Sequence, residues 1–228
     1  MQEARQKTFF GRRRGKGMSA AKDSLVASRM AEFEVALPAS GPVDFSSLFD
    51  FRPEKISFEI GYGDGEHMAA MAKKNPGEAF IGAEAFENGN AAALKSIIEG
   101  GLENVRVFPN DANLLFPHMP EGALDRLYIL YPDPWPKSRH EKRRMVNPAN
   151  IAAFARMLKR GGEMLVATDH TVYAAWVVLA MRGQDMFEWT AEKSSDFTRP
   201  PPDWETTRYE QKALKEGRVP VYLSFRKK

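Results

Sequence analysis

Strand-like and helix-like patterns alternate along most of this chain, and this alternation constrains the fold more than any other feature. Short apolar stretches typical of strands occupy residues 55–60, 79–83, 104–108, 124–130 and 163–168. Helical patterns occupy residues 66–74, 87–99, 148–158 and 170–181, the third capped by Gly161-Gly162, and two more strands are expected at 187–190 and 219–225. Strands that alternate with helices form a parallel sheet covered on both faces, so the sequence predicts a doubly wound α/β fold.

The first strand runs into a glycine-rich turn, Gly61-Tyr62-Gly63-Asp64-Gly65, and a helix follows. Glycines at such a turn let a ligand approach the backbone closely, beside the free amides of a helix start. The second strand ends at Glu84, 23 residues after Gly61. A carboxylate in that position can accept hydrogen bonds from both ribose hydroxyls. Together these features predict a site for an adenosine-type cofactor.

The spacing of the glycines indicates which cofactor binds. Dinucleotide sites use Gly-x-Gly-x-x-Gly, but here the third glycine comes one residue early and Glu66 stands in its place. A carboxylate at that helix start would repel a pyrophosphate, which argues against a dehydrogenase. S-adenosylmethionine, which has a sulfonium and no phosphate, suits the site better. Glu59 is a charge inside a buried strand and needs a partner, for which the ammonium end of that ligand is a candidate.

Three prolines enclose a carboxylate and an indole in the stretch Tyr131-Pro132-Asp133-Pro134-Trp135-Pro136. Each proline disfavours the helical region for the residue before it, so Tyr131, Asp133 and Trp135 are expected to be extended and to point to one side. Asp133 follows the strand at 124–130, at the sheet edge where ligands bind in open α/β folds. A proline-stiffened loop with no ligand is the alternative interpretation.

Basic residues are concentrated in two segments. One directly follows the prolines, Lys137-Ser138-Arg139-His140-Glu141-Lys142-Arg143-Arg144. The other is the first 22 residues, which carry seven Lys or Arg against a single acid, Glu3. That segment is expected to be a flexible arm that orders on a phosphate backbone, the alternatives being a solvated tail or a targeting arm. Residues 23–50 are interpreted as a connector, so the arm and connector span 1–50 and the main domain 51–228.

Composition excludes several classes of function. The 228 residues are 43% hydrophobic and 28% charged, typical of a globular protein, and the longest apolar run, 174–181, is too short to span a bilayer. With no signal-peptide pattern, a cytoplasmic protein without a membrane partner is expected. There are no cysteines, and the four histidines lack metal-ligand spacing, so no metal is expected. The net charge of +3, clustered as above, favours a polyanionic partner.

Two further aspartates follow predicted strands. Asp111 comes after the third strand, where it could bind an adenine amino group or act only as a turn residue. Asp169 comes after the fifth strand and opens a helix, so capping that helix is an alternative to a ligand role.

The motif Pro132-Asp133-Pro134-Trp135-x-Lys137-x-Arg139-His140-x-Lys142-Arg143-Arg144 resembles the hallmark of bacterial tRNA (guanine-N7-)-methyltransferases, and Glu59 to Gly65 also fits that family. The resemblance covers nearly all of residues 10–228. It implies a class I methyltransferase fold, a seven-stranded and mostly parallel sheet with an antiparallel last strand. It also implies S-adenosyl-L-methionine as cofactor and guanine 46 of the tRNA variable loop as target.

The resemblance also implies roles for individual residues. The expected cofactor contacts are Glu59, Gly61, Gly63, Gly65, Glu84, Asp111 and Asp133. The expected substrate contacts are Lys137, Asp169, Thr207, Arg208, Tyr209 and Glu210. Apart from the resemblance, the clustered positive charge predicts tRNA-backbone contacts at Arg12, Arg13, Arg14, Arg139, Lys142, Arg143 and Arg144. Residues 201–206 are longer than the family pattern, so the choice between Thr206 and Thr207 stays open.

Guanine N7 carries a lone pair and no proton, so it can attack a sulfonium methyl without a general base. We expect Asp133 to stabilise the positive charge that develops on the purine while pairing with its N1 and N2 hydrogens, with Glu210 as a second candidate. Trp135 is either a platform for an unstacked base or a core residue. Methylation of an exocyclic amine and a non-catalytic tRNA-binding scaffold remain alternative functions, and both a monomer and a homodimer are compatible with the sequence.

Overall fold

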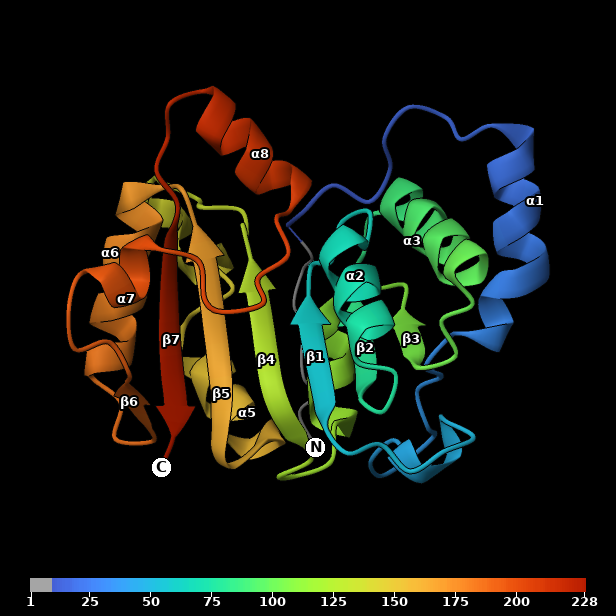
Figure 1. Ribbon diagram of the computed structural model, residues 1–228, viewed down its shortest axis with the longest axis horizontal. Coiled ribbons are helices and arrows are strands. Elements are labelled where there is room, and N and C mark those ends of the chain that lie inside the picture. The colour runs from blue at the N-terminus through green and yellow to red at the C-terminus, as the bar shows by residue number, and fades with distance from the viewer. Residues whose placement is uncertain (1–9) are drawn as a thin grey trace.

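A seven-stranded sheet with the strand order β3-β2-β1-β4-β5-β7-β6 forms the centre of the protein, seen in a computed structural model that describes residues 10–228 (Figure 1). The strands are β1 (Ile56–Ile60), β2 (Ala79–Ala83), β3 (Val105–Phe108), β4 (Leu124–Leu130), β5 (Leu158–Thr168), β6 (Phe187–Trp189) and β7 (Val221–Lys227). Strands β1 to β5 pair in parallel, whereas β7 is antiparallel to both β5 and β6. The predicted doubly wound, mostly parallel fold with an antiparallel last strand is confirmed.

Helices cover both faces of this sheet. They are α1 (Ala20–Arg29), α2 (Glu66–Lys74), α3 (Glu87–Gly100), α4 (Ala112–Leu115), α5 (Pro148–Met157), α6 (Thr171–Arg182), α7 (Ser195–Thr198) and α8 (Arg208–Lys215), with short 3-10 turns η1 (Met30–Glu32), η2 (Phe45–Ser47), η3 (Phe116–His118) and η4 (Ser138–Arg143). Apolar residues of α1, α2 and α3 pack on one face of β2 and β3, and those of α5 and α6 pack on the opposite face. Figure 1 shows α2 and α3 in front of the sheet and α5 behind it.

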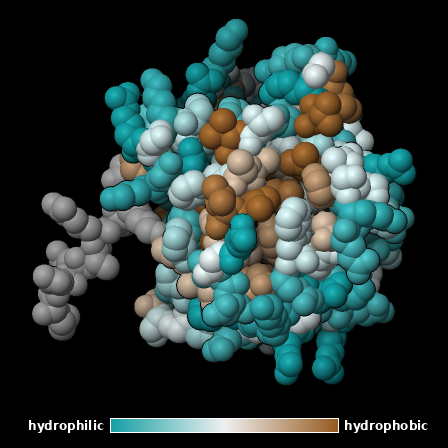
Figure 2. All heavy atoms as spheres, turned by 90° about the vertical axis from the view of Figure 1, so that its left-hand side faces the viewer, coloured by the Kyte–Doolittle hydropathy of each residue, from teal (hydrophilic) through white to brown (hydrophobic). Residues whose placement is uncertain are grey.

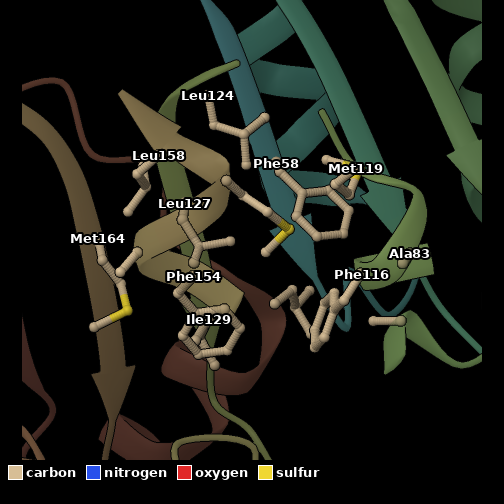
Figure 3. Close-up of a cluster of buried hydrophobic side chains, with 14 of the residues drawn as sticks. Phe58, Ala83, Phe116, Met119, Leu124, Leu127, Ile129, Phe154, Leu158 and Met164 are labelled. Atoms are coloured by element: carbon tan, nitrogen blue, oxygen red, sulfur yellow. The ribbon is translucent and has the colours of Figure 1, made fainter. Parts of the chain in front are cut away.

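The larger core lies on the α5 face. Phe58 of β1 and Leu127 and Ile129 of β4 point into it, because residues two apart on a strand share a face. Phe116 meets Phe58 and Phe154 edge to face, at ring-centroid distances of 6.4 and 5.6 Å. Figure 3 shows these side chains interlocked between the strands and α5. Full burial of each such side chain stabilises the fold by roughly 1.5–3 kcal/mol, which holds β1 and β4 side by side.

One predicted helix end is wrong. The helix at residues 148–158 was expected to be capped by Gly161-Gly162, but α5 ends at Met157 and Leu158 already belongs to β5. Both glycines lie within β5, where the pairing with β4 changes register between Leu124 and Arg126. Gly161 has a φ of +77°, a conformation that glycine adopts readily, so the glycines allow the irregular backbone at this point of the strand.

The segment interpreted as a connector packs into the main core. Val35, Val43 and Phe49 are all buried there, and Glu34 forms an isolated parallel bridge with Val107 of β3. Met30 packs in the smaller core formed by α2 and α3. Residues 30–49 therefore belong to the same packed unit as the sheet.

The direction of β7 determines what lies at the carboxyl edge of the sheet. Because β7 is antiparallel to β5, β7 begins at the edge of the sheet where β1, β4 and β5 end. The segment that precedes β7, including α8, therefore lies at that edge. Figure 1 shows α8 above that edge. The order changes direction between β1 and β4, which is the switch point where open α/β sheets bind ligands.

Helix α6 is apolar even on its outer side. Val172 and Leu179 are 47% and 67% exposed, and Figure 2 shows apolar side chains gathered on this side of the molecule, with hydrophilic ones around them.

Within residues 10–228, no helix is both long and apolar enough to cross a membrane. The same residues contain no group of three or more His, Asp or Glu arranged to hold a metal ion.

Candidate active site

A cleft of about 650 Å³ opens at the carboxyl edge of the sheet, a volume typical of small-molecule sites. Segments that follow four different strands line it. They contribute Gly61 and Gly63 after β1, Glu84 and Phe86 after β2, Asp111 and Asn113 after β3, and Asp133 and Trp135 after β4. The other lining residues include residues 10–12, 142–145, Asn147, Asn150 and Tyr209. The structure thus brings residues from distant parts of the sequence together at the predicted edge.

The glycine turn has the conformation that its sequence predicts. Gly61, Gly63 and Gly65 have φ values of +75°, +58° and +80°, a region that favours glycine over residues with a Cβ atom. Gly65 is the N-cap of α2, and a Cβ added there would lie 2.7 Å from the Cβ of Ala93. The turn and α3 are therefore in backbone-to-helix contact, which brings Gly61 and Gly63 to the floor of the cleft.

Glu84 is held rigidly between the turn and α3. Its carboxylate accepts hydrogen bonds from the backbone amides of Gly63 and Phe86, both at 2.9 Å. Burial raises the pKa of Glu84, and the nearby charge of Asp133 adds to this effect. A fixed acceptor beside glycine backbone is the arrangement that a ribose diol requires, so these residues fit the adenosyl end of the expected cofactor.

Replacement of Gly89 with alanine tests how closely α3 approaches the glycine turn, because a Cβ atom at this position would clash with the carbonyl oxygen of Gly63. Alanine favours a helix over glycine by about 1 kcal/mol, so a simple propensity effect would stabilise Gly89→Ala. We expect the opposite, a lower melting temperature and at least a 10-fold weaker affinity for S-adenosylmethionine by calorimetry. Gly183→Ala, where nothing lies within 4 Å, is the matched control. A stable Gly89→Ala protein with unchanged affinity would contradict the predicted contact.

Glu59 has a protein partner that the sequence did not predict. It is 5% exposed, and its carboxylate lies 2.7 Å from Nδ1 of His67 on α2. The ring of His67 also packs against those of Tyr128 and Trp204, at 5.0 and 5.1 Å. Glu59 is absent from the residues lining the cleft. His67 is therefore the hydrogen-bond partner of the buried Glu59, and a cofactor contact of Glu59 stays a prediction.

Asp111 lines the cleft and also begins α4. Its side chain is 6% exposed and accepts hydrogen bonds from the backbone and side-chain nitrogens of Asn113, at 3.0 and 2.8 Å. The turn role and the ligand role considered above are thus compatible, because a fixed carboxylate still faces the cleft. Neighbouring Asn110 accepts a hydrogen bond from Arg13, which ties this wall to the N-terminal segment.

The proline loop differs from the predicted extended shape. Tyr131 and Trp135 have φ values of +50° and +40°, so the expectation that both are extended is wrong. A following proline excludes the right-handed helical region but does not set the sign of φ. Tertiary contacts set it here, since the Tyr131 amide donates to the Ala167 carbonyl of β5 at 2.8 Å while its ring packs beside Tyr222. No hydrogen bond or ion pair within residues 10–228 engages Asp133, which is exposed at the cleft.

Arg143 is held between two aromatic rings. Its guanidinium lies 4.5 Å from the ring centre of Phe10 and 5.0 Å from that of Trp135. Trp135 is half-buried and meets His140 edge to face at 5.6 Å, while still lining the cleft. Trp135 is thus a wall residue of the site, which leaves the role of base platform as a prediction.

The described part of the basic arm lies against α3. The Arg14 guanidinium pairs with Glu87 at 2.8 Å, the Glu87 amide donates to the Arg13 carbonyl, and the Gly15 amide donates to Asn88. Phe10, Gly11 and Arg12 then cross to the proline loop and line the cleft. A flexible arm was expected, but residues 10–17 have specific contacts; residues 1–9 lie outside the described part.

Arg144 is buried, with 3% of its surface exposed, and its guanidinium donates to the Pro134 and Trp135 carbonyls. This burial disagrees with the phosphate contact expected from the basic run. Lys142 of the same run is exposed and lines the cleft, as a phosphate contact requires.

Thr207 and Glu210 form the buried start of α8. The Thr207 hydroxyl caps the helix by accepting from the Glu210 amide at 3.1 Å. The Glu210 carboxylate, 4% exposed, accepts from Trp204 Nε1 and from the Tyr222 hydroxyl, both at 2.6 Å. Both of its oxygens therefore have protein partners and Glu210 does not line the cleft, so its role as second candidate at the guanine stays a prediction. Thr206 is exposed, whereas Thr207 is buried.

The other residues of the tail separate into cleft and surface positions. Tyr209 is 47% exposed and lines the mouth of the cleft over Gly63. Arg208 pairs with Asp64 of the glycine turn at 2.5 Å. Helix α8 is thus linked to the turn through Arg208, with Tyr209 directed at the site.

Asp169 does not cap α6. The N-cap of that helix is His170, and the Asp169 carboxylate pairs with Arg218. The helix begins at Thr171, one residue later than the capping hypothesis requires, and Asp169 instead contacts the segment before β7. Lys137 and Arg139 are exposed and do not line the cleft.

Several residues with a role in the site were missed from the sequence. The ring of Trp204 packs against that of His67. Phe10 packs on the guanidinium of Arg143, and Trp176 of α6 packs on that of Arg144. These contacts join residues far apart in the chain and leave no local signal. The capping-box pattern of Thr207 and Glu210 was readable, since a threonine three residues before a glutamate marks a helix start.

Comparison with known proteins gives a consistent result. A family described as "Putative methyltransferase" matches residues 53–223. The tRNA (guanine-N(7)-)-methyltransferase of Rhodospirillum rubrum is 41% identical over 96% of this chain and 88% of that protein. The protein of the same name from Rhizobium johnstonii is 42% identical over 96% of this chain and 94% of that protein.

Solved structures with the same fold are more distant in sequence. The 16S rRNA methyltransferase KamB superposes with a TM-score of 0.54 at 13% identity, over 85% of this chain and 97% of that chain. A putative methyltransferase from Streptococcus mutans in complex with SAH gives a TM-score of 0.51 at 12% identity, over 77% of this chain and 90% of that chain. At these identities the similarity supports the fold alone.

Proposed function

The chain belongs to the bacterial tRNA (guanine-N(7)-)-methyltransferase family, and from this premise we propose that it methylates N7 of guanine 46 in the tRNA variable loop with S-adenosyl-L-methionine. It is an S-adenosylmethionine-dependent methyltransferase by family, and we assign its site of action to the cytoplasm, where its tRNA substrate is found.

One observation carries the proposal. The Asp133 carboxylate, free of protein partners within residues 10–228, lines the same cleft as the Glu84 carboxylate, which is fixed by two backbone amides. This supports an assignment of Glu84 to a sugar-like ligand and leaves Asp133 available to a second ligand. A methyl transfer between two bound molecules requires such a pair of adjoining subsites.

The cofactor would be held by the residues that follow β1, β2 and β3. Glu84 would accept hydrogen bonds from the ribose hydroxyls, and the glycine turn would allow the ligand to approach the backbone closely. Asp111 would bind the adenine end. Bound S-adenosylmethionine supplies an electrophilic methyl group. The protein supplies an enclosed site that fixes the direction of approach, an effect that can contribute roughly 7–11 kcal/mol.

Asp133 would hold the guanine. N7 is an acceptor without a proton, so no side chain has to remove one. The carboxylate accepts hydrogen bonds from N1 and N2 of the purine and stabilises the positive charge that the ring gains. Because prolines flank Asp133 on both sides, its position costs little reorganisation on binding. Trp135 and Tyr209 are the aromatic rings at the cleft on which the extracted base would stack.

Binding of the tRNA backbone is assigned to exposed cations around the cleft. Lys142 and Arg12 line it, and Lys137 and Arg139 are exposed within seven residues of Asp133 in the sequence. Extraction of a base costs a few kcal/mol, which phosphate contacts can offset.

Neutralising these cations should change the salt dependence of tRNA binding. Each lost phosphate contact lowers the slope of log K against log salt by about 0.7–0.9. We expect Lys137→Gln/Lys142→Gln to weaken tRNA binding and to reduce the slope by about 1.5, measured by filter binding at several salt concentrations. Arg160→Gln, on an exposed position near the start of β5, is the control that should change neither value. An unchanged slope in the double variant would count against phosphate contacts at these lysines.

The function is tested by nucleoside mass spectrometry after incubation of the protein with labelled S-adenosylmethionine and an unmodified tRNA transcript. We expect labelled 7-methylguanosine, located at position 46 by nuclease mapping, and no product on a transcript with adenosine at that position. A label on an exocyclic amine would favour another base methyltransferase. Tight tRNA binding without donor affinity or product would favour a non-catalytic scaffold.

A further inference from the structure

Arg144 occupies an unusual position for the last cation of a basic run. Its side chain is 3% exposed, whereas Lys142 two residues earlier is exposed. The guanidinium Nε lies 3.3 Å from the carbonyl oxygens of both Pro134 and Trp135, and Nη2 lies 3.1 Å from the latter. These carbonyls belong to the two residues that follow Asp133.

The backbone that Arg144 holds is strained. Trp135 has a φ of +40° and is not a glycine, and such conformations persist only where surrounding contacts enforce them. A planar guanidinium that donates to two consecutive carbonyls is suited to this task, because its donors are fixed relative to one another. Arg144 thus contacts both carbonyls of the two residues that follow Asp133.

Helix α6 fixes Arg144 from the other side. The indole of Trp176 packs against the guanidinium at 4.5 Å from its ring centre, and its Nε1 donates to the Val146 carbonyl at 2.6 Å. The hydroxyl of Tyr173, a fully buried residue, accepts from the Val146 amide at 3.3 Å. The segment that carries Arg144 is therefore anchored to a helix packed on the main core.

We propose that Arg144 is a positioning residue that sets the geometry of Asp133 through the proline loop, and that it is not a contact for the tRNA backbone. This inference rests on the proposed function, since it concerns the carboxylate assigned to the guanine. A misplacement of about 1 Å at a reacting centre can cost about 10²-fold in rate. The loss of Arg144 should consequently appear in kcat.

The test compares Arg144→Lys with wild type in the full chain. Lysine keeps the charge but can neither donate from a planar fork nor pack flat on Trp176. We expect kcat to fall by about 10²-fold, while the tRNA Kd stays within about twofold and the salt slope of binding is unchanged. Hydrogen exchange should increase in peptides covering residues 131–147 and stay unchanged in β1 and β2.

Trp176 provides a second variant that does not alter charge. Trp176→Phe keeps an aromatic ring beside the guanidinium, whereas Trp176→Leu removes it. We expect Trp176→Leu to lower kcat more than Trp176→Phe. The double variant Arg144→Lys/Trp176→Leu should lose less than the product of the two single losses, because both substitutions release the same loop.

Two results would overturn the proposal. One is an Arg144→Lys protein with normal kcat and unchanged hydrogen exchange at 131–147. The other is a loss of kcat with unchanged hydrogen exchange at 131–147. If Arg144→Lys fails to fold, the Trp176 pair decides, and equal kcat in its two variants would refute the proposal. Absence of tRNA methylation by wild type would instead refute the proposed function, so the two failures are distinguishable.

Discussion

Replacement of Asp133 with alanine is expected to lower kcat for tRNA methylation by at least about 10³-fold, the upper range for loss of one preorganised polar group in an active site. The reason is that Asp133 is the carboxylate in the cleft left free for the purine by the other described residues. The tRNA Kd should change little, because phosphate contacts supply most of the affinity. Single-turnover assays at saturating donor, together with filter binding, measure both quantities.

Asp133→Asn refines this test. An amide can still accept one hydrogen bond but carries no charge, so intermediate activity would separate hydrogen bonding from charge stabilisation. Asp185→Asn, an exposed aspartate after α6, is the matched control and should keep wild-type kcat. If Asp133→Ala keeps its turnover, Asp133 has no part in the mechanism.

Replacement of Glu84 with glutamine is expected to weaken S-adenosylmethionine binding by at least about 10²-fold. The two hydrogen bonds from the ribose hydroxyls to the Glu84 carboxylate would contribute about 1.5–3 kcal/mol each. In Glu84→Gln, the side-chain NH₂ group would also face a backbone N–H that donates to the carboxylate in the wild type, so two donors would meet. Calorimetry measures the affinity directly. Glu99→Gln, on the exposed last turn of α3, is the matched control. Equal affinities in wild type and Glu84→Gln would remove Glu84 from the cofactor site.

The affinity should also depend on pH in a defined direction. Burial raises the pKa of Glu84, so this carboxyl group takes up a proton at a higher pH than an exposed glutamate does. The ionised form is the better acceptor for ribose hydroxyls, so affinity should fall as the pH is lowered through that raised pKa. Glu84→Gln should reduce this pH dependence.

The regular elements were predictable from the sequence because their signals are local. The bounds of α2, β2 and β4 agree with the sequence pattern, since glycine, proline or a charged residue ends each apolar period. The cleft residues that follow strand ends, Glu84, Asp111 and Asp133, were found for the same reason. A parallel sheet brings its strand ends together whatever the details of packing.

The parts that could not be predicted depend on contacts between distant residues. The partner of Glu59 is His67, and this contact depends on the packing of α2 against β1. Arg144 and Glu210 were expected from the sequence to contact the tRNA substrate, but both are buried beside partners on α6, β7 and the proline loop. The positive φ values of Tyr131 and Trp135 likewise arise from tertiary contacts that overrule a local proline preference.

The placement of β7 also bears on how the chain folds during synthesis. Within residues 10–228, β6 pairs only with β7, which in turn pairs with β5. Residues 187–189 therefore have no strand partner until residues 221–227 leave the ribosome, although β1 to β5 can already assemble. The half of the sheet that carries Glu84 and Asp133 can thus form first, and the tail with Tyr209 is added when the final strand inserts.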